Sequence, residues 1–269
     1  MYLGVDVGGT KTLLAVFTKD GKLKQSVKFS TPQNYSQFLD ALTENIQALD
    51  VEDFSACCIA IPGVIDRDKE IGLDFGNLPW QNVHIVEFLE KFLKTPVLLE
   101  NDAKLAGLYE ASNIKDRYKK VLYITISTGI GISLIIDGVI DTNIGDGGGH
   151  SLMLQNGKET ISWEELASGK AITKKYGKQA SEINDPEIWK VISRKFALGL
   201  IDVISLLQPE VVVIGGGVGS HFKKFGAYLK TDLKKYEMPI MKIPPVIPAK
   251  RPEEAVIYGC YELLKARHG

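Results

Sequence analysis

The chain has 269 residues, and 45% of them are hydrophobic, which is enough for one large core or two smaller ones. Its 32 basic and 33 acidic residues balance, so composition gives no field that would recruit nucleic acid or a membrane surface. No apolar run reaches the roughly 18 residues that suggest a membrane span. We expect small-molecule partners, no nucleic-acid or membrane partner, and a cytoplasmic location.

The first part of the chain predicts a meander followed by alternating helices and strands. Two strand-like runs meet at Gly8-Gly9 in YLGVDVGGTKTLLAVFT, and KLKQSVKF alternates like a third strand. Helical periodicity in YSQFLDALTENIQAL precedes the buried strand SACCIAI, then the helix VHIVEFLEKFLK and the strand TPVLLE. The cysteines in this part, and Cys260, lie in core-like sequence without disulfide or metal spacing.

The second part begins in a similar way. The strands KVLYITIST and GISLIIDGVI are joined by a glycine-containing turn, and helices are predicted over Trp163–Tyr176 and Pro186–Leu207. The strand EVVVIGGG, a helix over Gly219–Tyr236, a proline-rich link and a last helix, EEAVIYGCYELLKA, follow. These two halves predict two α/β lobes around a central cleft: residues 1–108 and 109–252, with a helix at about 253–269 packing back on the first lobe.

The glycine turns suggest phosphate binding. In DVGGTKT, Gly8 and Gly9 lack the side chains that would keep a phosphate from the backbone N–H groups, and Thr10 and Lys11 add donors. Asp6 can hold Mg²⁺ through water. An ordinary hairpin turn is the alternative for any one of these turns, but three of them stand at strand ends. The other two contribute Thr128, Gly129 and Gly131, and Gly216 and Gly217.

Two familiar nucleotide motifs are absent. The sequence contains no G-x-x-x-x-G-K-[ST], which excludes a P-loop, and GGGVGS lacks the last glycine of G-x-G-x-x-G.

Taken together, the motifs resemble a known family. VDVGGTKT, IPGVID, GNLPW, ENDAKLAGLYE, STGIGISLIIDG, GGGH, WEELASGKAI and VVVIGGG follow one another as in the ROK family of sugar kinases and sugar-responsive repressors. The resemblance is to bacterial glucokinases and spans nearly the whole chain. It implies the α/β fold of actin-like ATPases, also called the sugar kinase or ribonuclease H-like fold, with ATP and Mg²⁺ as cofactors.

In ENDAK the resemblance implies that Asp102 is the catalytic base, which takes the proton of a sugar hydroxyl and helps to place Mg²⁺ with Asp6. A sugar hydroxyl is a weak nucleophile at neutral pH, so an oriented carboxylate suits this reaction. Asn101 can both donate to and accept from sugar hydroxyls. The alternative is that Asn101 or Asp102 caps the following helix. Glu100 is expected at the surface, at the end of its strand.

The segment after GDGGGH departs from the family pattern. Family members carry a histidine and three cysteines that bind zinc, but no cysteine lies between His150 and Glu164, so we expect no zinc site. The resemblance aligns Glu164 with a sugar-contacting glutamate of the family, His150 remains a candidate sugar contact beside it, and Gly63 is a further substrate-binding candidate. Gly147 stands where the family has a glutamate, which removes one acceptor for a sugar hydroxyl and leaves space for water or an N-acyl group.

The expected activity is ATP-dependent phosphorylation of a hexose in carbohydrate metabolism and glycolysis, with glucose at its 6-hydroxyl as the first choice. The alternatives are an N-acetylmannosamine kinase, a fructokinase and, in another class, a sugar-binding regulatory protein without turnover. Relatives are commonly dimers, so a homodimer remains open.

Overall fold

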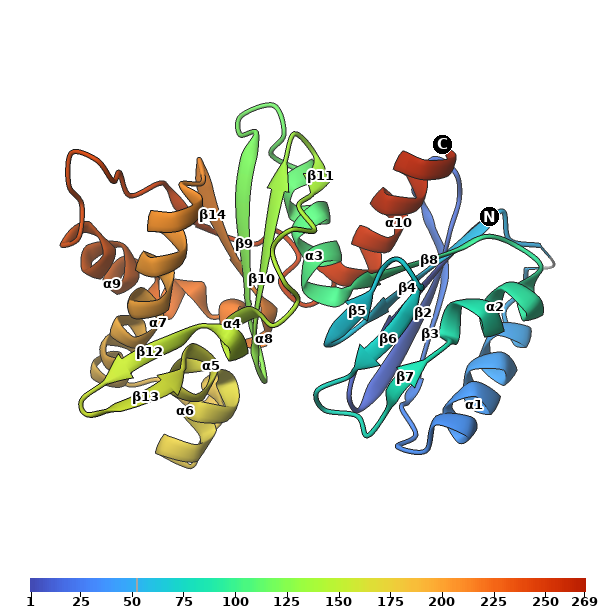
Figure 1. Cartoon of the computed structure of the whole chain (residues 1–269), viewed down its shortest axis with the longest axis horizontal. Coiled ribbons are helices and arrows are strands. Elements are labelled where there is room, and N and C mark those ends of the chain that lie inside the picture. Colours follow the sequence, from blue (N-terminus) through green and yellow to red (C-terminus); the bar gives the residue numbers. More distant parts are fainter. Residues whose placement is uncertain (52) are drawn as a thin grey trace. The chain divides into compact units, whose positions relative to one another are not determined.

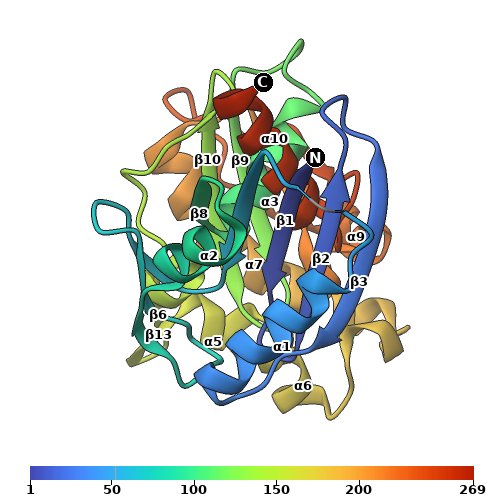
Figure 2. The same ribbon diagram turned by 90° about the vertical axis from the view of Figure 1, so that its right-hand side faces the viewer.

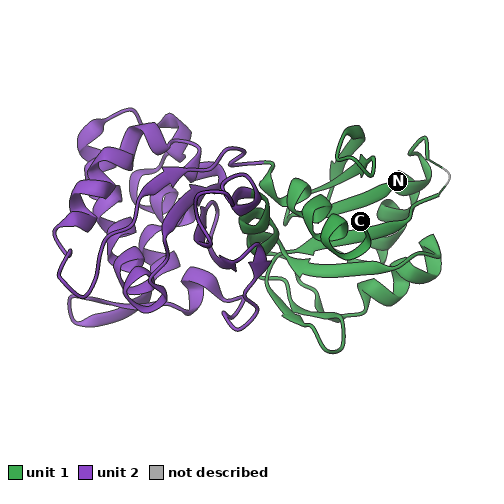
Figure 3. Cartoon of the chain, turned by 90° about the horizontal axis from the view of Figure 1, so that it is seen from above, with its two compact units in different colours: residues 1–109, 254–269 green, residues 110–253 purple. Residues whose placement is uncertain are grey.

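A computed structural model describes residues 1–51 and 53–269 and divides the chain into two compact units. Unit 1 consists of residues 1–109 and 254–269, and unit 2 of residues 110–253 (Figure 3). The C-terminal segment of the chain thus completes the unit that the N-terminal strands begin.

Unit 1 is built on a five-stranded sheet of order β3-β2-β1-β4-β8 (Figure 1). Its first three strands are antiparallel and form the predicted meander, whereas β4 and β8 run parallel to β1. The strands are β1 (Tyr2–Val7), β2 (Lys11–Phe17), β3 (Leu23–Ser30), β4 (Ala56–Ile61) and β8 (Val97–Asn101).

Helices cover both faces of this sheet because successive side chains of a strand point to opposite sides. The face that carries Leu3, Val5 and Val7 packs under α1 (Tyr35–Gln47) and α2 (Ile85–Leu93), which lie in front of the sheet in Figure 2. The other face packs against α3 (Asp102–Ser112) and α10 (Ala255–His268).

A small second sheet follows β4 in unit 1. It is formed by β5 (Val64–Asp66), β6 (Ile71–Asp74) and β7 (Gln81–Val83), and sequence periodicity did not reveal it. Strands of three or four residues are too short for an alternation of apolar and polar residues to distinguish them from turns.

Unit 2 contains a five-stranded sheet of order β11-β10-β9-β14-β15, in which β14 and β15 run parallel to β9. Its core consists mostly of aliphatic side chains and also contains aromatic ones, among them Trp163, Trp189 and Phe225. The strands are β9 (Lys120–Ile126), β10 (Ile130–Ile136), β11 (Val139–Ile140), β14 (Val211–Gly215) and β15 (Val246–Pro248), with a hairpin of β12 (Met153–Asn156) and β13 (Glu159–Ser162).

Two of the helices predicted for unit 2 had wrong bounds. The predicted helix Trp163–Tyr176 breaks at Ser168, whose backbone is extended and whose hydroxyl accepts from Ala171 N to cap the second piece. The helix predicted from Gly219 begins at Phe222 instead. The helices are α4 (Gly148–Ser151), α5 (Trp163–Ala167), α6 (Gly169–Tyr176), a 3₁₀ turn (Ala180–Glu182), α7 (Pro186–Leu207), α8 (Gly216–Gly219) and α9 (Phe222–Lys234).

No helix within the described residues is both long enough and apolar enough to cross a bilayer.

Candidate functional site

The first glycine turn of unit 1 joins β1 to β2. Gly8 N donates to Lys11 O over 3.0 Å, and a Cβ on Gly8 would lie 2.7 Å from that same carbonyl oxygen. Glycine is therefore required sterically at this position. Thr10 and Lys11 are exposed at the turn, so their donor groups face solvent.

Thr31, which sequence reasoning did not single out, holds this turn in place. Its hydroxyl donates to Gly8 O over 2.8 Å, and its backbone N–H donates to Thr10 O over 3.0 Å. The hydroxyls of Thr31 and Thr12 share a further hydrogen bond of 2.9 Å. A threonine that follows a strand carries no motif, so only the structure reveals this support.

Two carboxylates of unit 1 influence one another electrostatically. The pKa of Asp6 is raised to about 7, first by burial and then by the nearby charge of Asp102, while Lys28 opposes the shift. Lys28 and Asp6 occupy the same row of the sheet, because each is paired with Leu13 of β2. Because the two carboxylates repel each other when both are ionised, a divalent cation bound between them would be stabilising.

The junction between β8 and α3 uses Asn101 for structure. Asn101 Oδ1 accepts from Lys104 N over 3.2 Å, which caps α3, and Asn101 Nδ2 donates to Gly63 O over 2.9 Å. Asp102 is half-buried, and its Oδ1 accepts from Ala103 N over 2.7 Å. Helix capping, the alternative reading of this motif, is thus performed by Asn101. Gly63, Asn101 and Asp102 lie together in unit 1.

The expectation that Glu100 lies at the surface was wrong. Glu100 is only 6% exposed, and both of its carboxylate oxygens are bound by the guanidinium group of Arg67. On the neighbouring strand β4, the residue paired with Glu100 is Ala60, which is fully buried. The side chain of Glu100 therefore lies on a covered face of the sheet. A carboxylate that is removed from water needs such a partner.

In unit 2 the second and third glycine clusters lie side by side. The turn after β9 and the turn after β14 are neighbours because these parallel strands pair up to Thr125 and Gly215. Gly216 has φ +83°, and a Cβ there would lie 2.5 Å from Ile126 O. Only glycine lets the two turns approach so closely.

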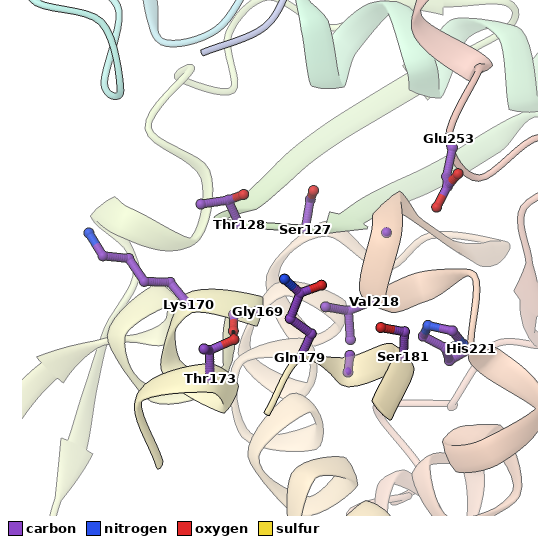
Figure 4. Close-up of a pocket in the computed structure, with 12 residues that line it drawn as sticks. Ser127, Thr128, Gly169, Lys170, Thr173, Gln179, Ser181, Val218, His221 and Glu253 are labelled. Atoms are coloured by element: carbon purple, nitrogen blue, oxygen red, sulfur yellow. Dashed lines mark hydrogen bonds between the residues drawn. The ribbon is translucent and has the colours of Figure 1, made fainter. Parts of the chain in front are cut away.

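A pocket of about 510 Å³ opens at these two turns (Figure 4). In the view of Figure 4, Thr128 and Lys170 lie on one side of the pocket, and Ser181, His221 and Glu253 on the other. Two of the predicted nucleotide-binding residues, Thr128 and Gly217, line it; Gly129, Gly131 and Gly216 lie beside them in the chain. The lining also includes Ser127, Gly169, Thr173, Gln179, Ala180 and Val218.

Most residues on the far side of this pocket carried no sequence signal. Gln179 and Ser181 come from a short segment without a glycine motif, and His221 precedes α9. Burial and the neighbouring charge of Lys224 lower the pKa of His221, and this shift favours the neutral imidazole. The nearby charge of Glu253 acts in the opposite direction. Lys170 could have been found, because it belongs to the quoted motif WEELASGKAI.

Glu164 and His150 lie near each other and near the β9–β10 turn. Glu164 Oε2 accepts from Ile130 N over 2.9 Å, and a Cβ on Gly129 would lie 2.4 Å from the same oxygen. His150 Nδ1 is 4.0 Å from Glu164 Oε1, with the imidazole side chain 78% exposed. Glu164 therefore supports the turn, and His150 is open to solvent beside it.

The space beside Gly147 is occupied. A Cβ on Gly147 would lie 1.8 Å from Ser151 Oγ and 2.9 Å from Ser151 Cβ, so Ser151 fills the volume expected to be empty. Gly148 and Gly149 serve close packing on β10, since a Cβ on either would meet Ile130 at under 3 Å. The glycine run thus has a packing role in unit 2.

Across residues 1–51 and 53–269, no group of three or more His, Cys, Asp or Glu side chains is arranged to hold a metal ion. Asp6 and Asp102 provide only two carboxylates, which suits a cation whose remaining ligands are water and phosphate oxygens.

Comparison with known proteins gives matches along the whole chain. The family model described as "ROK family" matches residues 2–267. The N-acetyl-D-glucosamine kinase of Histophilus somni is 26% identical, covering 99% of this chain and 100% of the relative. A glucokinase of Streptomyces coelicolor is 25% identical over 81% of this chain and 82% of its own.

Among solved structures, the ROK family glucokinase from Streptomyces griseus in complex with glucose and AMPPNP has a TM-score of 0.84. It is 24% identical, and the match covers 100% of this chain and 99% of that one. Such a likeness establishes the fold, and it confirms the α/β actin-like ATPase class expected from the motifs.

Proposed function

Because the chain belongs to the ROK family, we propose that it is an ATP-dependent kinase that phosphorylates a hexose. The observation that carries the proposal is the pocket of unit 2, which Thr128 and Gly217 line from two adjacent glycine turns. Backbone N–H groups without side chains around them suit phosphate groups, and polar side chains further along suit a nucleoside. Similarity to sugar kinases over 81% to 99% of this chain supports a hexose as the acceptor.

The two units supply different parts of the chemistry in this proposal. In unit 2, Ser127 to Gly131 and Gly216-Gly217 receive the nucleotide. In unit 1, the turn of Gly8, Gly9, Thr10 and Lys11 offers donors to phosphate oxygens, since two of its side chains are exposed. Asp102 accepts the proton of the sugar hydroxyl while that oxygen forms its bond to the γ-phosphorus and ADP leaves.

Asp6 and Asp102 would hold Mg²⁺, through water or a phosphate oxygen. When bound, the ion neutralises the negative charge of the phosphates. The pKa of Asp6 is raised to about 7, and a neighbouring cation would lower it again, because the cation favours the ionised carboxylate. We propose no zinc site for this chain.

The proposed sugar contacts remain Gly63, Asn101, His150 and Glu164. Hydrogen bonds within the protein already occupy some of their donor and acceptor atoms. Asn101 has one bond to Gly63 O and one from Lys104 N, and amide groups can form further hydrogen bonds at each end. Glu164 Oε2 is engaged by Ile130 N, so the other oxygen is the better acceptor for a hydroxyl.

Glucose, phosphorylated at its 6-hydroxyl, is the substrate that we propose first, within cytoplasmic carbohydrate metabolism and glycolysis. Kinases of N-acetylglucosamine and of glucose both match this chain at about one quarter identity, which favours no single sugar. N-acetylmannosamine and fructose are the other candidates, and a homodimer stays a prediction.

The test is a panel of glucose, mannose, fructose, N-acetylglucosamine and N-acetylmannosamine with Mg²⁺-ATP, scored by ADP release. We expect turnover with at least one sugar, with kcat in the usual range of roughly 1–10³ per second. Thermal melting with each sugar runs in parallel. A sugar that stabilises the protein without any ADP release would instead favour a regulatory protein without turnover, and would contradict the proposal.

A further inference from the structure

Two contacts tie the segment 63–67 to the end of β8. At its start, Gly63 O accepts from Asn101 Nδ2 over 2.9 Å. At its end, Arg67 Nε donates to Glu100 Oε2 over 3.2 Å, and a terminal guanidinium nitrogen donates to Glu100 Oε1. The two residues of β8 that make these contacts directly precede Asp102.

The contact between Arg67 and Glu100 is a shielded ion pair. The side chain of Glu100 is 8% exposed and that of Arg67 is 27% exposed, and Glu100 Oε1 also accepts from Asn101 N over 2.8 Å. A guanidinium group binds both carboxylate oxygens in a fixed plane, which an ammonium group cannot do. The pair therefore fixes direction as well as distance.

The segment can leave β4 in only a few ways. Gly63 has φ +94°, and a Cβ there would lie 2.0 Å from Asp74 O, so this glycine fixes a tight start. Arg67 is then the second anchor of a segment of five residues. With both ends held, the backbone at Gly63 keeps one position relative to Asn101 and the first turn of α3.

We propose that Arg67 and Glu100 are positioning residues for the sugar: their ion pair holds the segment 63–67 in register with Asn101 and Asp102. The inference rests on the proposed function, and it adds two residues that the motifs did not assign. Neither side chain needs to touch the sugar. Loss of the pair is expected to weaken sugar binding, because Gly63 O and the Asn101 amide would no longer be fixed relative to each other.

The experiment compares Arg67→Met, Arg67→Lys and the control Lys69→Met, using whichever sugar of the panel is turned over fastest. Lys69 lies two residues beyond the segment and pairs with Asp66 at 3.2 Å, and its side chain is 74% exposed, so Lys69→Met matches the loss of one cation. For Arg67→Met we expect the KM for sugar to rise about tenfold, the ratio that corresponds to losing about one neutral hydrogen bond to the sugar from Gly63 O or the Asn101 amide. The KM for ATP should stay within about twofold, because the residues lining the pocket of unit 2 are unchanged.

Arg67→Lys should fall between wild type and Arg67→Met, and Lys69→Met should match wild type. An unchanged KM for sugar in Arg67→Met, or equal increases in both KM values, would overturn the inference. A purely structural role would lower the soluble, active fraction and leave both KM values alone. If Arg67→Met does not fold, Arg67→Lys and Glu100→Gln decide by the same two constants. If wild type phosphorylates no sugar, the proposed function fails first, and the inference fails with it.

Discussion

Asn101 and Asp102 are neighbours for which we propose different tasks. The amide of Asn101 makes two structural bonds, one to cap α3 and one to Gly63, and so fixes the backbone on which Asp102 begins the helix. Helix capping by Asn101 is therefore compatible with the proposed role of Asp102 as the catalytic base.

Asp102→Asn tests the proposed base. Asparagine keeps an oxygen that can accept from Ala103 N, so the first turn of α3 should persist. It cannot take a proton from a hydroxyl, and we expect kcat to fall by about 10²-fold or more at saturating sugar and ATP. Near-normal kcat, with an unchanged circular dichroism spectrum, would remove Asp102 from this role.

Gly147→Ala tests how tightly the glycine run is packed. Ser151 Oγ can rotate away from a new methyl group, but Ser151 Cβ at 2.9 Å cannot, so part of α4 has to shift. We expect the free energy of unfolding to fall by about 1–3 kcal/mol.

Ser151→Gly in the same chain should recover most of that loss, since it removes both close atoms. Additive effects of the two substitutions in urea unfolding would show that residues 147 and 151 do not interact. The same crowding argues against the earlier expectation that Gly147 leaves room for an N-acyl group.

At this scale, sequence motifs identified the residue types but missed their partners. Nothing in the strand TPVLLE distinguishes a buried glutamate from an exposed one, because burial of Glu100 depends on Arg67, 33 positions away. Thr31 and His221 were missed for the same reason: their contacts are to segments remote in sequence. The roles of the site residues themselves remain predictions.

Among the elements, α3 carries a buried acid near its end. Glu110 Oε2 accepts from Lys250 N over 2.8 Å and Oε1 from Arg251 N over 2.9 Å, so the carboxylate holds the chain where it leaves β15. Burial nevertheless raises the pKa of Glu110 above its ordinary value, against these two bonds.

Glu110→Gln tests the sign of this shift. As the pH rises past the ordinary value of 4.5, the unfolded chain loses its proton while the native protein retains it. Stability from this group is therefore full below 4.5 and is lost as the pH rises through the higher native pKa. We measure the free energy of unfolding of both proteins by urea denaturation. The value for wild type minus the value for Glu110→Gln should decrease as the pH rises from 4 to 7. A difference that increases would contradict the direction.

Element boundaries were predictable where periodicity was long and failed where local chemistry intervened. The meander and the long helix α7 followed from alternation and from a 3.6-residue period. The break at Ser168 did not, because WEELASGKAI keeps helical composition on both sides, and only the extended backbone at the cap separates α5 from α6.

At the scale of the whole molecule, the fold class was predictable because motifs occur in order along the entire chain. The family model confirms that recognition over residues 2–267. The choice of sugar was not predictable, since relatives named for different sugars match this chain at similar identity, and substrate choice depends on a few side-chain contacts.

The whole protein is expected to need no zinc, since no cysteine lies between His150 and Glu164. A chelator selective for zinc over Mg²⁺ should leave both the activity and the melting temperature unchanged. Metal analysis of untagged protein provides the second measurement, and one equivalent of zinc per chain would contradict the prediction.

The return of the last residues to unit 1 affects the order in which the protein can fold. Helix α10 covers a face of the first sheet, and its Gly259 lies so near α3 that a Cβ would be 2.0 Å from Leu105 O. A ribosome releases residues 110–253 before this helix exists, so unit 2 can complete its core while unit 1 still exposes an apolar face. The sheet of unit 1 is thus made before unit 2 but is covered only after it, and this exposed sheet is where a chaperone would be expected to bind during synthesis.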